Sequence, residues 1–112
     1  MKIEIKNRYT RKLIVLGEYQ NIREAVERNK ANMGCADLRW ANLQDANLQG
    51  ANLQGANFRN TNLRNAYLDD ANLRDADLRG ADYEGTSFRG ADVRSITTGS
   101  QIWEPQIYNL IE

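Results

Sequence analysis

The sequence predicts an all-β solenoid, in which the chain turns a corner every five residues and its coils stack on one another. Two observations carry this prediction. First, thirteen consecutive five-residue units run from Ala31 to Ser95 without a gap, each with a large residue at its centre. These centres are Met33, Leu38, Leu43, Leu48, Leu53, Phe58, Leu63, Leu68, Leu73, Leu78, Tyr83, Phe88 and Val93. Second, the residue two places before the centre is Ala in eleven units, and the residue between them is Asn or Asp in eleven.

A five-residue period fits neither of the common secondary structures. On an α-helix each residue turns about 100°, so apolar residues five apart would spiral around every side and form no buried face. On a flat strand an odd period alternates faces and would place every second centre in water. The helix and the flat strand are therefore both excluded.

A square coil of four units satisfies the pattern. Each centre then points inward, and the Ala before it fills the little space that remains in a close-packed interior. Successive coils of about twenty residues stack at roughly 4.8 Å through strand-like hydrogen bonds. Asn, Asp and Gly suit the corners because they tolerate the left-handed conformation or bond their own backbone.

This Ala-(Asn/Asp)-Leu-x-x pattern resembles the pentapeptide-repeat family, over 65 of the 112 residues. The resemblance implies a right-handed quadrilateral parallel β-helix, here of about three coils. The alternative interpretation, a disordered low-complexity tract, gives no reason for Leu and Ala to keep a strict phase.

Residues 1–30 are predicted to form an N-terminal cap. Ile3 and Ile5 alternate with charged residues, and the apolar run at 13–16 is rich in strand formers, so a β-hairpin is expected. Asn21 followed by Glu24 predicts the start of a short helix with a capping box. A separate function for these residues is the alternative to a plug over the first coil.

Residues 96–112 leave the repeat pattern but are too apolar to lie free in water. They are expected either to cap the last coil or to form an interface, and the resemblance favours a homodimer. The candidate interface residues are Ile102, Trp103, Ile107, Tyr108 and Leu110.

Residues twenty apart should stack, which converts the sequence into a map of the surface. The residue after the centre reads Arg39, Arg59, Arg79 along one face and Gly34, Gln54, Arg74, Arg94 along the next. The other two faces read Gln44, Arg64, Glu84 and Gln49, Asp69, Arg89, each with an opposite-charge neighbour. The candidate interaction surface is Arg39, Arg59, Arg79, Arg74, Arg94 and the adjacent Trp40. The alternatives are a solvated face neutralised by Asp37, Asp75, Asp77 and Asp92, and a Trp40 packed against the hairpin.

The composition argues against catalysis and cofactors. The chain has no His and a single Cys, so the usual His-based triads, His metal ligands and intrachain disulfides are excluded. Acidic residues do not stack at one-coil spacing, so the sequence predicts no calcium site. A coil packed with Leu also leaves no cavity for a ligand. No apolar stretch approaches the length of a membrane span, and no signal peptide is evident, so a cytoplasmic protein is expected.

The predicted function is a non-catalytic, rigid protein-interaction module with an unidentified protein partner. The alternative is a DNA-mimicking modulator of DNA gyrase or another DNA-handling enzyme, which the family resemblance suggests. Charge argues against it, because a rod of about 15 Å should carry roughly nine negative charges to imitate duplex DNA. Residues 31–95 hold 7 Arg against 9 acidic residues, and the whole chain is neutral, which also argues against direct nucleic-acid binding.

Overall fold

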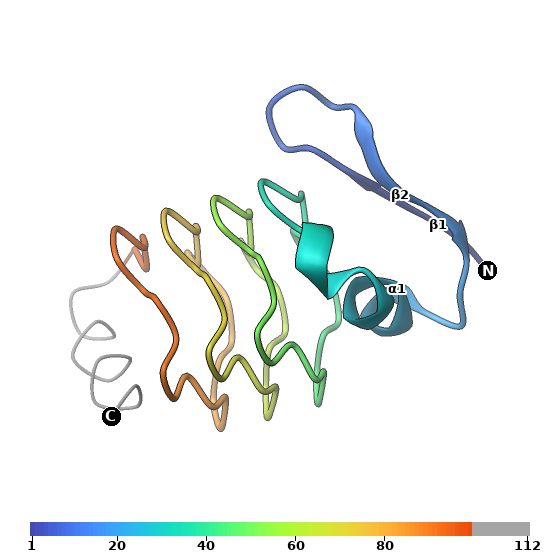
Figure 1. The fold of residues 1–112 in the computed structure, drawn as a ribbon. Helices are drawn as coiled ribbons and strands as arrows, with labels where there is room; N and C mark the ends of the chain where they lie inside the picture. The colour runs from blue at the N-terminus through green and yellow to red at the C-terminus, as the bar shows by residue number, and fades with distance from the viewer. Residues whose placement is uncertain (100–112) are drawn as a thin grey trace.

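A computed structural model describes residues 1–99, which form a short N-terminal hairpin and helix followed by a stack of coils (Figure 1). Strands β1 (Lys2–Lys6) and β2 (Leu13–Glu18) pair antiparallel, with Ile5 opposite Val15. Helix α1 spans Ile22–Arg28, and a 3₁₀ helix, η1, spans Lys30–Asn32. The predicted strand pair and helix are thus both present.

From residue 36 onward the chain winds as a β-helix solenoid. Each described parallel bridge joins residues twenty positions apart, as in the series Asp37–Asn57–Asp77–Thr97. The hydrogen bonds run between adjacent coils: the Leu38 N–H donates to the Asn57 carbonyl at 2.9 Å, and the Asn57 N–H donates to the Ala36 carbonyl at 2.9 Å. The twenty-residue stacking predicted from the sequence is therefore confirmed.

Every unit ends in a tight turn. The N–H of the next unit's first residue donates to the carbonyl of the centre, as from Ala41 to Leu38 at 3.1 Å. The fifth residue of every unit from 31 to 95 has a positive φ, whereas the fourth does not, which is the pattern of a type II turn. The Asn or Asp before the centre adds a second bond, because its side-chain oxygen accepts the N–H two residues later, as from Gln44 to Asn42 at 3.2 Å. The corner is therefore specified at two positions for two different reasons.

The interior holds all thirteen predicted centres. Leu38 and Phe58, one coil apart, are 1% and 0% exposed, and the most exposed centre, Tyr83, is at 7%. Thr61 and Thr86, which replace the usual Ala, are also buried, and the Thr61 hydroxyl donates to the Leu38 carbonyl at 2.6 Å. A buried hydroxyl is tolerated here because it has this partner.

The N-terminal elements share the solenoid's hydrophobic core. Ile5 and Val15 from the hairpin and Ala25 and Val26 from α1 belong to the same buried cluster as the centres. The chain after β1 also pairs with the first coil, because the Asp37 N–H donates to the Lys6 carbonyl at 2.8 Å. The hairpin is therefore joined to the coil both by backbone bonds and by packing.

The helix begins as predicted but without the full capping box. The Asn21 side chain accepts the Glu24 N–H at 2.9 Å and caps α1. The Glu24 carboxylate lies 3.3 Å from Arg28, one turn along the helix. The Glu24 carboxylate was expected to reach back to Asn21, but it forms an i,i+4 ion pair with Arg28 instead.

Two details at the ends of the repeat differ from the prediction. Ala31 was expected to point inward, but it lies exposed in η1, because the first unit begins inside the connection from α1. At the other end the backbone pairing continues past Ser95, since the Thr97 N–H donates to the Ala76 carbonyl at 3.0 Å and Thr98 is buried at a centre position. The candidate interface residues Ile102, Trp103, Ile107, Tyr108 and Leu110 lie outside the described residues.

Candidate interaction surface

We call the surface of Arg39, Arg59 and Arg79 the Arg39 face. Its two outer arginines fold back on acidic residues of their own units. Nε and Nη2 of Arg39 each lie 2.9 Å from a carboxylate oxygen of Asp37. Arg79 binds Asp77 in the same bidentate way, at 2.9 and 2.7 Å. Such paired bonds fix the guanidinium plane and neutralise it locally.

The hairpin adds two more arginines to this face, which the repeat pattern could not predict. Arg11 Nη1 lies 2.8 Å from the Asp37 carboxylate, and Arg8 Nη2 lies 3.7 Å from that of Asp77. Arg8 also stacks over the Tyr9 ring, 5.0 Å from its centroid. Each of the two aspartates therefore forms ion pairs with two arginines, one from the coil and one from the hairpin.

Arg59, in the middle of the Arg39 face, is different. Its unit has Asn57 where the neighbouring units have Asp, and the Asn57 side chain accepts only the Arg59 backbone N–H, at 3.1 Å. Within residues 1–99 the exposed Arg59 guanidinium makes no ion pair and no hydrogen bond. The face thus carries five Arg (8, 11, 39, 59 and 79) against two Asp (37 and 77), a local charge of +3, with one arginine free to bind an anion.

The adjoining face of Gln54, Arg74 and Arg94 also has one arginine paired with an Asp of its own unit and one that is not. Arg94 binds Asp92 through two bonds of 2.8 and 2.6 Å. Arg74 follows Asn72 and, among the described residues, has only its backbone N–H bonded to that side chain, at 3.1 Å. On these two faces an Asp two places before an Arg binds its guanidinium, whereas Arg59 and Arg74, which follow an Asn, make no ion pair among the described residues.

The remaining two faces behave differently from each other. The predicted stacked pair of Arg64 and Glu84 is present at 3.7 Å, and Arg64 also lies 3.5 Å from Asp82. The predicted pair of Asp69 and Arg89 is not formed in the described part of the chain, where one Asp69 carboxylate oxygen is buried without a hydrogen-bond partner. The stacking of opposite charges at twenty-residue spacing is thus confirmed on one face only.

Trp40 does not pack against the hairpin, which corrects the alternative considered from the sequence. Its side chain is 76% exposed. It occupies the fifth position of its unit, with φ of 64°, so its side chain leaves the coil at a corner. Its backbone N–H donates to the Arg59 carbonyl at 3.1 Å, which places Trp40 one coil away from the free arginine.

The arginines lower the pKa values of their acidic partners. The Arg39 guanidinium, with help from Arg11, holds the pKa of Asp37 well below its ordinary value against the opposing effect of burial. Arg79 likewise lowers the pKa of Asp77. These carboxylates are therefore ionised throughout the physiological range and stay bound to their arginines.

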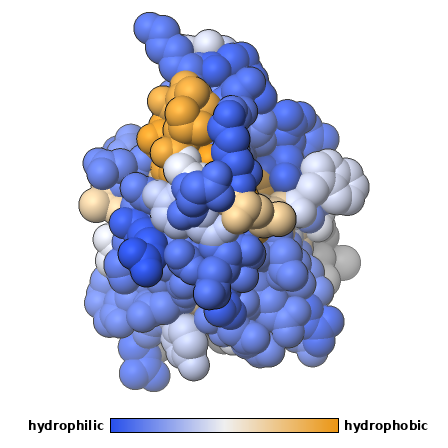
Figure 2. All heavy atoms as spheres, turned by 90° about the vertical axis from the view of Figure 1, so that its right-hand side faces the viewer, coloured by the Kyte–Doolittle hydropathy of each residue, from blue (hydrophilic) through white to orange (hydrophobic). Residues whose placement is uncertain are grey.

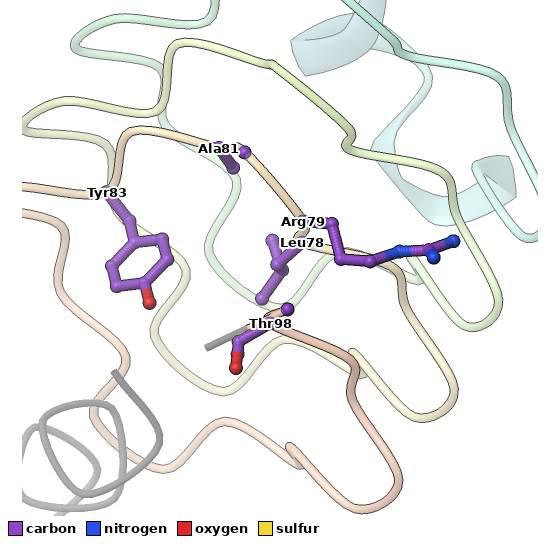
Figure 3. Close-up of a pocket in the computed structure, with 7 residues that line it drawn as sticks. Leu78, Arg79, Ala81, Tyr83 and Thr98 are labelled. Atoms are coloured by element: carbon purple, nitrogen blue, oxygen red, sulfur yellow. The ribbon is translucent and has the colours of Figure 1, made fainter. Parts of the chain in front are cut away.

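The two ends of the described molecule have other surface features. Figure 2 shows an apolar patch on the hairpin end, framed by hydrophilic residues. Leu13 and Leu16 of β2 are exposed apolar residues of the hairpin. At the opposite end a hollow of about 430 Å³ is lined by Leu78, Tyr83 and Thr98, from which the Arg79 side chain extends away (Figure 3). Burial raises the pKa of the Tyr83 hydroxyl, so this phenol stays protonated. Neither feature brings a nucleophile and a base together.

The described residues contain no group of three or more His, Cys, Asp or Glu side chains placed to hold a metal ion. No helix among residues 1–99 has the length and apolarity needed to cross a membrane. The surface presents a free guanidinium, paired guanidinium–carboxylate groups and an exposed indole.

Of the predicted surface residues, Arg39, Arg59, Arg79 and Trp40 lie together, and Arg74 and Arg94 lie on the adjoining face. Arg8 and Arg11 were missed, because only the pairing of the hairpin with the first coil brings them to the Arg39 face. The bidentate pairs of Arg39, Arg79 and Arg94 could have been found from the sequence, since each has an Asp two places earlier. The pairing of Arg64, which follows Asn62, depends instead on acidic residues of the next coil.

Comparisons with known proteins agree with the repeat geometry. The family model "Pentapeptide repeats" matches residues 31–70 and 66–94, in eight copies. No protein with a curated description matches the chain.

Solved structures similar to this chain include two pentapeptide repeat proteins. One is a pentapeptide repeat protein from the thylakoid lumen of Arabidopsis thaliana, at 33% identity and a TM-score of 0.54. The other is the pentapeptide repeat protein Rfr23 from the cyanobacterium Cyanothece 51142, at 43% identity and a TM-score of 0.54. In each case the match covers 55% of this chain and 43% of the other, so the matched part spans less than half the length of either protein.

Proposed function

The chain belongs to the pentapeptide-repeat family, and on that premise we propose that it is a non-catalytic, rigid module for binding another protein. The family implies the right-handed quadrilateral winding and about three coils. A solenoid of this kind presents flat faces of regularly spaced side chains, because each coil repeats the one before it. We propose a cytoplasmic location on the basis of the sequence alone.

The observation that carries the proposal is the free guanidinium of Arg59. Its neighbours Arg39 and Arg79 are locked to aspartates, whereas Arg59 is exposed and unpaired among the described residues. An arginine held between fixed neighbours loses less freedom when it binds a carboxylate than one on a mobile loop. We therefore assign the Arg39 face as the binding surface, with Arg59 at its centre.

Affinity capture from the native host tests this assignment. Arg59→Glu reverses the charge at the centre of the face and should reduce recovery of the specific partner by about tenfold or more. Arg89→Glu is the matched control, because Arg89 has the same place in its unit and lies thirty residues, or one coil and two corners, from Arg59, on the opposite side of the stack. Equal recovery by both variants would remove the Arg39 face from the proposal.

The DNA-mimicking alternative has less support. A mimic must present carboxylates, but the Arg39 face carries a local charge of +3 and its two aspartates are occupied by arginines. We expect no inhibition of gyrase supercoiling and no protection of gyrase from quinolones. Either effect would favour the alternative over the interaction module.

A further inference from the structure

The backbone at Trp40 is unusual for so large a residue. All thirteen fifth-position residues of the repeat have a positive φ, and apart from Trp40 they are Gly, Asn, Asp, Ser or Cys. Gly adopts this conformation without cost, and Asn or Asp tolerate it, but a bulky side chain there is an outlier. Trp40, at φ of 64°, therefore strains the corner it occupies.

Nothing in the described part of the chain offsets this strain. An indole normally contributes by burying a large apolar area, but Trp40 is 76% exposed. The residues below it in the same corner column are Asn60 and Gly80, which fit the corner without such a cost. A residue that disfavours the fold both by its backbone and by its exposure points to a role outside the fold.

The neighbourhood of Trp40 indicates what that role is. The backbone N–H of Trp40 donates to the backbone carbonyl of Arg59. The exposed indole and the free guanidinium therefore belong to adjacent coils. Trp and Arg, together with Tyr, are the residue types enriched among those that dominate binding energy in protein interfaces. The two differ in chemistry, since one offers an apolar surface and the other a bidentate site for a carboxylate.

We propose that Trp40 and Arg59 form a two-part anchor for an acidic segment of a partner protein, in which one carboxylate binds Arg59 and a nearby apolar side chain packs on the indole. This inference rests on the proposed function and names the partner chemistry of that surface. A single free guanidinium between two occupied ones fits an isolated carboxylate. A run of phosphates would instead meet Asp37 and Asp77 on both sides, so the anchor favours protein over nucleic acid.

The first test separates binding from folding. Trp40→Asn places a residue suited to the left-handed corner and removes the exposed indole, so the melting temperature should rise by about 4 °C. Tyr67→Asn is the control, because Tyr67 is also an exposed aromatic, at 55%, but lies on another face and has no positive φ. A fall in the melting temperature of the Trp40→Asn variant would show that the indole stabilises the fold and would overturn the proposal.

The second test measures binding of named probes to the full chain by isothermal titration calorimetry. A synthetic ten-residue peptide of alternating Glu and Leu should bind, and its Gln–Leu counterpart should bind at least about tenfold more weakly. Trp40→Asn and Arg59→Gln should each weaken the Glu–Leu complex by about tenfold or more, and Tyr67→Asn should not. Absence of binding by the Glu–Leu peptide, or tighter binding of a ten-nucleotide oligo-dT, would refute the anchor.

The outcomes distinguish the anchor from the broader function. If Arg59→Glu loses the captured partner while Trp40→Asn retains it at full affinity, the interaction module stands and the Trp40 anchor is refuted. If the Glu–Leu peptide binds through both residues but no protein partner depends on Arg59, the proposed function fails although the site exists.

Discussion

Gly80→Ala tests how tightly the corner residues of adjacent coils are stacked. Gly80 has φ of 73°, and a Cβ built on it would lie 2.2 Å from Oδ1 and 3.2 Å from Cγ of Asn60, one coil before it. Gly50 has nearly the same φ, 70°, but a Cβ there would meet nothing within 4 Å. Substitution by Ala therefore carries the cost of a positive φ at both glycines, but a steric clash with the neighbouring coil only at Gly80.

The shared cost is that of an L-residue in the left-handed region. It amounts to about 1–2 kcal/mol, partly offset because Ala also restricts the unfolded chain by roughly 0.4–1 kcal/mol. Gly50→Ala should thus lower the free energy of unfolding by about 1 kcal/mol. In Gly80→Ala the exposed Asn60 side chain must also rotate away from its place, and holding it off its preferred rotamer adds about 0.5–1.5 kcal/mol.

Urea titrations followed by circular dichroism would measure both variants. Asn60→Gly removes the obstructing side chain while suiting the positive φ of that corner, so the double variant Asn60→Gly/Gly80→Ala should lose most of the extra cost. If Gly80→Ala and Gly50→Ala destabilise equally, or if Asn60→Gly brings no relief, the stacked-corner reasoning is wrong.

Two further perturbations test the buried hydroxyl and the ion pairs. Thr61→Val keeps the shape of the side chain but removes its 2.6 Å hydrogen bond to the Leu38 carbonyl. In urea titrations this variant should lower the free energy of unfolding by about 1–2 kcal/mol. An unchanged free energy of unfolding would show that the hydrogen bond contributes nothing. Arg39 is the main cause of the lowered folded-state pKa of Asp37. The stability that the ionised Asp37 contributes is therefore fully present above the unfolded-state pKa of about 3.9, and it is lost as pH falls from there through the folded-state pKa. Asp37→Asn should therefore be less stable than the parent at pH 7, with a gap that narrows below pH ~4 in urea titrations; a gap independent of pH would contradict this assignment.

The sequence predicted the solenoid well because its information is local and repeated. Leu38 and Phe58 stack as expected, since a five-residue period leaves only a square coil as a way to bury every centre. The bidentate pair of Asp37 and Arg39 is equally local, because the two residues lie in one unit. The exposure of Ala31 was missed because the first unit is shared with the connection from α1.

The surface depended on contacts that no repeat encodes. Arg8 and Arg11 reach the Arg39 face only because the chain after β1 pairs with the first coil, a contact between segments about thirty residues apart. Trp40 could have been covered by that hairpin, and its exposure follows from where the hairpin docks. The sequence by itself determined the interior and the corners, since they recur every five residues. Only the tertiary structure decided which charges are neutralised and which side chains stay free, because that depends on non-repeating contacts across the stack.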